Sequence, residues 1–100
     1  MKTFTEMVWQ ACAKIPKGKV STYGEIAKAI GSSKSSRAVG NALNKNPDTV
    51  KTPCHRVVRS DGGVGGYAHG MKKKVELLKK EGIEVSPKGK IDLEKFLFKL

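Results

Sequence analysis

The sequence predicts a mainly α-helical fold with a small β element, a single winged helix-turn-helix-like domain over residues 1–100. Three observations predict this class. Apolar residues recur at helical spacing in four segments, a short polar turn joins two of these segments, and the β-branched pair Val57-Val58 is the clearest strand signal. A chain of 100 residues has room for one modest hydrophobic core.

The first predicted helix follows Thr5, a candidate N-cap. Its apolar positions lie on one side of a helix and comprise Met7, Val8, Ala11 and Cys12. Residues 16–18, Pro-Lys-Gly, end this pattern. Residues 19–21 then predict a short extended link to the next helix.

The next two predicted helices are joined by a turn. Thr22 and Glu25 have the spacing of a capping box, so a helix is expected to begin there and to stop at Gly31. Residues 31–36 are too few and too polar to form more than a turn, and residues 37–44 predict the second helix. This order of elements is the helix-turn-helix pattern.

The helix predicted over residues 37–44 has a divided surface. Arg37, Asn41 and Asn44 share one face, and the opposite face carries Val39, Ala42 and Leu43. Ala38 and Gly40 are small, which would let the backbone approach a groove closely. The alternative is an ordinary amphipathic helix with a solvated face.

The second half of the chain predicts a turn at residues 60–63 and a hairpin or glycine-rich loop over residues 59–67. Residues 63–68 match a relaxed dinucleotide fingerprint, but no βαβ unit fits around them, and we reject that interpretation. A last helix is expected over residues 70–81, with Met71, Val75 and Leu78 inward and Lys72, Lys73, Lys74, Lys79 and Lys80 outward. Residues 83–100 predict little beyond a turn near residues 86–89.

The charge balance points to a polyanionic partner. The chain has 20 Lys and Arg against 9 Asp and Glu, a net charge of +11 at pH 7. So many positive charges repel one another, and a polyanionic partner such as nucleic acid would explain why the chain carries them. A lysine-rich solvated surface, as in many heat-adapted proteins, is the alternative. No apolar run approaches the ~20 residues of a membrane-spanning helix. The first six residues have neither the apolar core nor the cleavage site of an export signal. We therefore expect a cytoplasmic protein without membrane contact.

The two cysteines, Cys12 and Cys54, are expected to be free thiols, because a reducing compartment disfavours a disulfide. With His55 and His69 they reach the ligand count of a zinc finger, but neither pair has close-ligand spacing. We therefore expect no metal site.

The stretch from Pro53 to Val58 carries the strongest chemical signal. A thiol becomes nucleophilic when it ionises, and a nearby base or positive charge lowers its pKa. His55 and Arg56 supply both kinds of group beside Cys54. Pro53 and the strand-forming valines place this cysteine on a bend entering a strand. Without these neighbours, a small buried hydrophobe would be the better interpretation of a lone cysteine.

These motifs together resemble the DNA-binding, active-site domain of the O6-alkylguanine-DNA alkyltransferases. The resemblance runs from about Thr3 to Gly82, in order and without a large gap. Its most specific element is residues 53–57, Pro-Cys-His-Arg-Val, supported by Thr22-Tyr23, Arg37-Ala38-Val39-Gly40, Asn46-Pro47, Val64-Gly65-Gly66-Tyr67 and Glu81-Gly82.

The resemblance implies a single-turnover transfer of an alkyl group to Cys54, with no cofactor. His55 would be the general base and Glu81 its orienting partner. Tyr23 would donate a proton toward the guanine O6. Asn46 would tie the helix-turn-helix to the active-site loop.

The resemblance also implies that the partner is double-stranded DNA containing O6-alkylguanine, with the damaged base extruded from the stack. Arg37 would fill the vacated space, and its helix, with Ala38, Gly40 and Asn41, would enter the minor groove. The main chain at Cys54, Val57 and Ala68 would hold the extruded base. Tyr67 would wall the pocket, and His69 near its rim would limit the size of the O6 substituent. We expect a monomer.

Two other functions stay open at this point. The larger relatives carry an additional N-terminal domain, which this chain is expected to lack, and single-domain alkyltransferase-like proteins bind alkylated bases without repairing them. Those proteins typically have Trp where Cys54 stands, so the thiol favours the enzyme over a lesion sensor. A sequence-specific winged-helix regulator would explain the charge and the helix-turn-helix, but it leaves residues 53–56 without a role.

Overall fold

The chain is mainly helical, as the sequence predicts. The computed structural model describes residues 3–32, 34–46, 52–67 and 70–100. Its elements in chain order are α1 (Phe4–Ala13), β1 (Ser21–Thr22), α2 (Tyr23–Ala29), α3 (Ser36–Asn44), the 3-10 helix η1 (Cys54–Arg56), β2 (Val57–Val58), α4 (Met71–Lys80) and α5 (Leu93–Phe96). Among the described residues, no helix is long and apolar enough to cross a bilayer.

Helix α1 begins earlier than the sequence predicts. Its N-cap is Thr3, whose hydroxyl accepts a hydrogen bond from the Glu6 amide at 3.1 Å, while the Glu6 carboxylate accepts from the Thr3 amide. Thr3 is the better cap because the residue three positions later can return a hydrogen bond. The expectation of a cap at Thr5 is therefore wrong by two residues.

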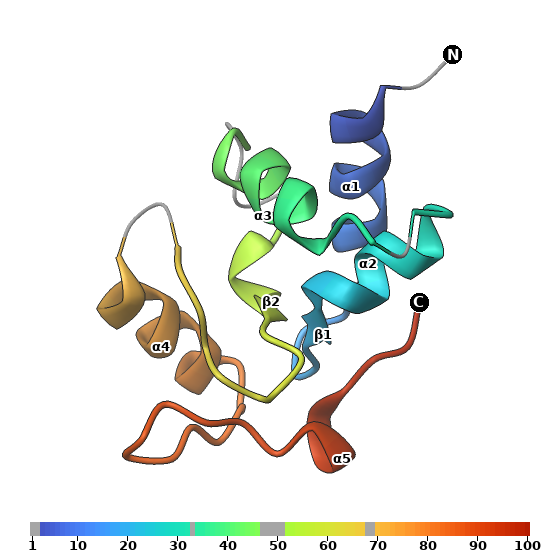
Figure 1. The fold of residues 1–100 in the computed structure, drawn as a ribbon. Helices are drawn as coiled ribbons and strands as arrows, with labels where there is room; N and C mark the ends of the chain where they lie inside the picture. Colours follow the sequence, from blue (N-terminus) through green and yellow to red (C-terminus); the bar gives the residue numbers. More distant parts are fainter. Residues whose placement is uncertain (1–2, 33, 47–51, 68–69) are drawn as a thin grey trace.

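Helices α2 and α3 form the predicted helix-turn-helix, and α1 packs against both of them (Figure 1). Thr22 caps α2 by accepting from the Glu25 amide at 3.0 Å. Helix α3 buries Val39, Ala42 and Leu43, as its predicted apolar face requires. The Trp9 indole of α1 donates to the Ala42 carbonyl at 2.9 Å and fixes α1 to α3.

The small β element is a parallel pair. Strand β1 pairs with β2 so that Ser21 faces Val57 and Thr22 faces Val58. The pairing joins the strand that leads into α2 to the strand that follows η1. Because the two strands are more than thirty residues apart in the chain, their pairing sets the cysteine motif beside the start of the helix-turn-helix.

The segment after α4 completes a second part of the core, which the sequence did not predict. Ile83, Ile91 and Phe96 pack with Val58 and Leu78. Val20 donates its amide to the Phe96 carbonyl at 2.9 Å and accepts from the Phe98 amide at 2.7 Å. These backbone bonds hold α5 beneath β1, and the chain end then runs up toward α2 (Figure 1). Helix α5 has only four residues, too short for a clear apolar period.

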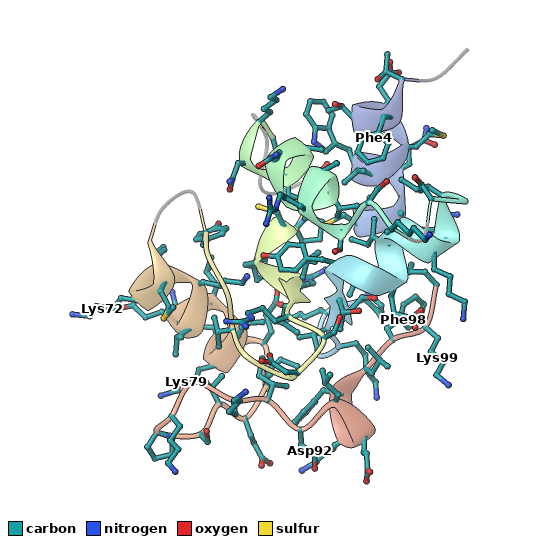
Figure 2. The ribbon with its side chains drawn as sticks, in the orientation of Figure 1. Phe4, Lys72, Lys79, Asp92, Phe98 and Lys99 are labelled. Atoms are coloured by element: carbon teal, nitrogen blue, oxygen red, sulfur yellow. The ribbon has the colours of Figure 1, made fainter. Side chains whose placement is uncertain are left out.

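Helix α4 buries a different set of side chains from the one predicted. Met71 is 57% exposed, and Lys74 is completely buried. Lys72 and Lys79 do point away from the molecule (Figure 2). Positions 71, 74, 75 and 78 share one helical stripe, and Lys74 follows it inward because its ammonium finds acceptors there.

One glycine in the loop after β2 is required both by its backbone conformation and by space. Gly62 has φ +89°, and a Cβ there would lie 2.7 Å from the Ile91 carbonyl oxygen. Ile91 also donates its amide to the Gly62 carbonyl at 2.8 Å, so the two segments cannot separate without losing that bond. The close approach of the two segments therefore depends on the absence of a side chain at Gly62.

Gly62→Ala should destabilise the fold by about 2–3 kcal/mol, the sum of the left-handed conformation and the overlap with Ile91. Gly31→Ala is the matched control, because Gly31 has φ +80° but no atom within 4 Å of its built Cβ. It should cost only about 1 kcal/mol. Urea denaturation measures both free energies of unfolding. Equal losses of stability in the two variants would show that the contact with Ile91 adds nothing to the cost.

Candidate functional site

Cys54 opens η1 directly before β2, on the bend that the sequence predicts. Its side chain is buried in the core cluster that α1, α2 and α3 share. Burial raises the pKa of the thiol, and a hydrogen bond from Asn46 and the charge of Lys74 oppose that rise without reversing it. The resting thiol is therefore protonated near neutral pH and needs a base to become a nucleophile.

His55, the next residue of η1, is a basic group that follows Cys54 directly in the chain. Its Nε2 lies 3.1 Å from Oε1 of Glu81, and the side chain is buried. Burial lowers the pKa of the imidazole, assisted by the charges of Arg56 and Lys74, and Glu81 opposes the decrease. The ring is therefore neutral at neutral pH. A proton on Nε2, facing the carboxylate, leaves Nδ1 as an acceptor, and Nδ1 has no hydrogen-bond partner among the described residues.

Arg56, which the sequence analysis offered as the cation beside the thiol, pairs with Glu81 in the structure. Its Nε donates to Glu81 Oε1 at 2.8 Å, its Nη2 donates to Oε2, and its Nη1 donates to the Ile15 carbonyl at 2.9 Å. Arg56 therefore connects η1 to the segment that follows α1 and to the end of α4.

Glu81 is shared by two partners, His55 and Arg56. Burial opposes its ionisation, but the hydrogen bonds of both partners and the positive charge of Arg56 outweigh burial and hold the pKa of the carboxyl below its ordinary value. The carboxylate is therefore ionised at neutral pH and fixes the imidazole in one orientation.

Asn46 and Tyr23 approach the same region from the helix-turn-helix. The Asn46 amide, just beyond α3, donates to the Thr52 carbonyl at 2.8 Å. It also hydrogen-bonds to Cys54. Burial and the neighbouring Cys54 raise the pKa of Tyr23, so its phenol keeps its proton and remains a hydrogen-bond donor.

Lys74, which the sequence analysis placed on the outward face, is buried at this cluster. Its Nζ donates to the Gly66 carbonyl at 3.0 Å and lies 3.5 Å from Tyr23 Oη. Its charge lowers the pKa of Cys54, the role that the sequence assigned to Arg56. The helical stripe of positions 71, 74, 75 and 78 was the signal that could have identified it.

A hollow of about 610 Å³ lies beside this cluster. Its lining comprises Tyr23, Gly40, Asn41, Asn44, Gly66 and Tyr67. The exposed side chains of Arg37 and Ala38 lie on the same helix, α3. Val57 has its side chain in the core, so only its main chain is available to a ligand. The predicted site residues Ala68 and His69, together with Pro47 of the family motif, lie outside the described residues.

The described part of the chain contains no cluster of three or more His, Cys, Asp or Glu residues that could hold a metal ion. The arrangement can deprotonate a buried thiol, supply a proton from a phenol, and receive a planar group beside α3. The fold and the site together define a helix-turn-helix protein with a buried free cysteine next to a histidine–glutamate pair.

Comparison with known proteins specifies the class further. Residues 3–83 match the family model described as 6-O-methylguanine DNA methyltransferase, DNA binding domain. The chain belongs to this family. It is 53% identical over 79 residues to a methylated-DNA–protein-cysteine methyltransferase of Methanosarcina acetivorans, covering 79% of this chain and 51% of the relative. The chain thus spans about half the length of the curated methyltransferase that it matches.

Two solved structures with DNA and a base-flipping protein are also similar to this chain. The structure of S. pombe Atl1 in complex with damaged DNA containing O6-carboxymethylguanine has a TM-score of 0.88 at 32% identity, with all of both chains covered. The structure of Mycobacterium tuberculosis OGT in complex with DNA has a TM-score of 0.77 at 42% identity and covers 81% of this chain and 50% of that one. A DNA base-flipping protein of Escherichia coli K12 is 38% identical over 94% of this chain and 73% of its own length.

Proposed function

We propose that the chain is a DNA repair protein that extrudes O6-alkylguanine from duplex DNA and transfers the alkyl group irreversibly to Sγ of Cys54. The observation that carries the proposal is a buried Cys54 thiol followed in the same short helix by a neutral His55 that Glu81 contacts. The relatives named as methylated-DNA–protein-cysteine methyltransferases support it.

The proposed step balances without a cofactor. His55 accepts the thiol proton, through a water if the distance requires one, and Sγ displaces the alkyl carbon. The bond between Sγ and carbon forms as the bond between carbon and O6 breaks, and the electron pair stays on the guanine. Tyr23 donates a proton, so neutral guanine departs instead of its anion. The thioether left on Cys54 cannot be reversed by these groups, so each protein molecule reacts once.

The DNA contact is proposed for the exposed face of α3. Arg37 and Asn41 are exposed there, Gly40 lines the hollow, and the whole chain carries +11. If six phosphates are neutralised, affinity for duplex DNA should fall about a thousandfold between ~50 and ~200 mM salt. Fluorescence anisotropy at several salt concentrations measures the slope. An affinity that does not depend on salt would contradict a DNA-binding function.

Arg37→Ala should reduce the transfer rate more than it reduces affinity for undamaged duplex. One phosphate contact is replaceable among 20 basic residues, whereas a side chain that fills the space of an extruded base is not. We expect at least about a tenfold loss of rate against less than about a threefold loss of affinity.

Lys79→Ala is the matched control for Arg37→Ala. Lys79 is also exposed and cationic, but it lies on α4 and points away from α3 (Figure 2). This variant should lose little of either quantity. Equal losses of rate and affinity in Arg37→Ala would reduce Arg37 to an ordinary backbone contact.

The decisive experiment is intact-mass measurement after incubation with a duplex containing O6-methylguanine. One equivalent should add about 14 Da to the peptide that contains Cys54, and excess substrate should add nothing further. An unmethylated duplex of the same sequence is the control. Absence of this mass change in folded protein would contradict the transfer.

The second candidate is a non-catalytic sensor that binds O6-alkylguanine and recruits another repair pathway. Similarity along the whole chain to Atl1, crystallised with damaged DNA, favours it. The free Cys54 thiol and its base favour the enzyme. Tight binding to the lesion with no mass change would decide for the sensor.

A further inference from the structure

Lys74 occupies a position that costs stability. It is completely buried on a helix whose neighbouring lysines, Lys72, Lys73, Lys79 and Lys80, are exposed. Transfer of an ammonium group from water into a protein interior is unfavourable unless its partners compensate. A methionine would fill the same space without this penalty, so the charge itself requires an explanation.

The contacts of Lys74 join two walls of the hollow. Its Nζ donates to the Gly66 carbonyl at 3.0 Å and, through a long hydrogen bond of 3.5 Å, to Tyr23 Oη. Both Gly66 and Tyr23 line the hollow beside α3. An ammonium group can only donate, so Tyr23 Oη accepts from it. The phenolic proton is thereby kept free for an acceptor on another side.

The groups that face Lys74 come from three other elements. They are Cys12 of α1, Tyr23 of α2, and Cys54 and His55 of η1. Burial lowers the pKa of Lys74 to about 8, and the two thiols oppose this decrease. At neutral pH the ammonium is therefore mostly protonated. Its charge lowers the pKa values of Cys54 and Cys12 and also that of His55.

We propose that Lys74 is a positioning residue for the alkyl transfer, stabilising the Cys54 thiolate as it forms and holding Tyr23 with its proton directed toward the guanine. The inference rests on the proposed function and assigns a role that Arg56, bound to Glu81, cannot fill. Lys74 keeps its own proton throughout. The thiol proton goes to His55, and the proton that reaches guanine comes from Tyr23.

The test uses Lys74→Met with Lys73→Met as the matched control, since Lys73 is the adjacent, exposed lysine. The first measurement is the rate of Cys54 alkylation by iodoacetamide against pH, followed by peptide mass, which needs neither DNA nor the proposed reaction. Lys74→Met should react at least about tenfold more slowly near pH 7, with the midpoint of its profile moved up by about one pH unit or more. The control should match the unmodified chain.

The second measurement is single-turnover transfer from methylated duplex. Lys74→Met should slow it by at least about tenfold, while affinity for the duplex changes less than about twofold. An iodoacetamide profile identical to that of the unmodified chain would overturn the proposal. If the unmodified chain accepts no methyl group from the duplex, the proposed function fails. The iodoacetamide profile still decides in that case whether Lys74 lowers the pKa of the Cys54 thiol.

Thermal unfolding separates this role from a purely structural one. Lys74→Met should be at least as stable as the unmodified chain near pH 7, because it removes a buried charge. A purely structural lysine would lower the melting temperature and leave the pH profile of the folded protein unchanged. Lys74→Gln, which retains a donor for Gly66 without the charge, should show the same shift in reactivity as Lys74→Met, and an unshifted profile in it would also overturn the proposal.

Discussion

Cys54→Ala should abolish alkyl transfer completely, a loss of at least about a thousandfold in rate. The reason is that the Cys54 thiol is the acceptor of the alkyl group in the proposed reaction. Affinity for the lesion should be retained, because the hollow is lined by other residues. Intact mass measures the transfer, and anisotropy with methylated and unmethylated duplex measures the binding.

The matched control is Cys12→Ala. Burial raises the pKa of Cys12 to about 12, with Cys54 contributing to the rise, so this thiol stays protonated and unreactive. The variant should transfer normally as long as it is folded. A mass increase of about 14 Da in Cys54→Ala would identify a different acceptor and contradict the proposed mechanism.

Arg56→Leu should lower the free energy of unfolding by about 4 kcal/mol, the largest effect on stability that we expect. The Arg56 and Glu81 side chains are only 16% and 13% exposed. The substitution would leave a buried carboxylate and the Ile15 carbonyl without their guanidinium. Urea denaturation measures the loss.

Arg59→Leu is the control for that prediction. Arg59 pairs with Asp61, but the two side chains are 64% and 49% exposed. Such a pair contributes little, so the variant should stay within about 1 kcal/mol of the unmodified chain. Similar losses in both variants would show that burial does not decide the strength of the Arg56 pair.

The same pair predicts a pH dependence. The pKa of Glu81 is held below its ordinary 4.5 in the folded protein. Its contribution to stability is therefore fully present above pH 4.5 and is lost as the pH falls through the lower folded value. Arg56→Leu should lose much of this dependence, so the difference in stability between the two proteins should shrink in acid.

The helices and their faces were largely predictable because caps and apolar periodicity act within a few residues. Thr22 caps α2, and Val39, Ala42 and Leu43 form the buried face of α3, as expected. Pro53 and the valines after Cys54 predicted the bend that η1 provides. Helix α5 and its place in the core were not predictable, since the bonds of Val20 with Phe96 and Phe98 join distant segments.

The sequence by itself determined the helix-turn-helix, the bend at Cys54 and the family resemblance, because these depend on local order along the chain. Only the tertiary structure decided which positively charged side chain interacts with which group. Arg56 pairs with Glu81, 25 residues away, and the buried Lys74 reaches Tyr23, 51 residues away. Burial raises the pKa of Cys54 and lowers that of His55, and burial depends on packing between distant elements, which residue order alone does not specify.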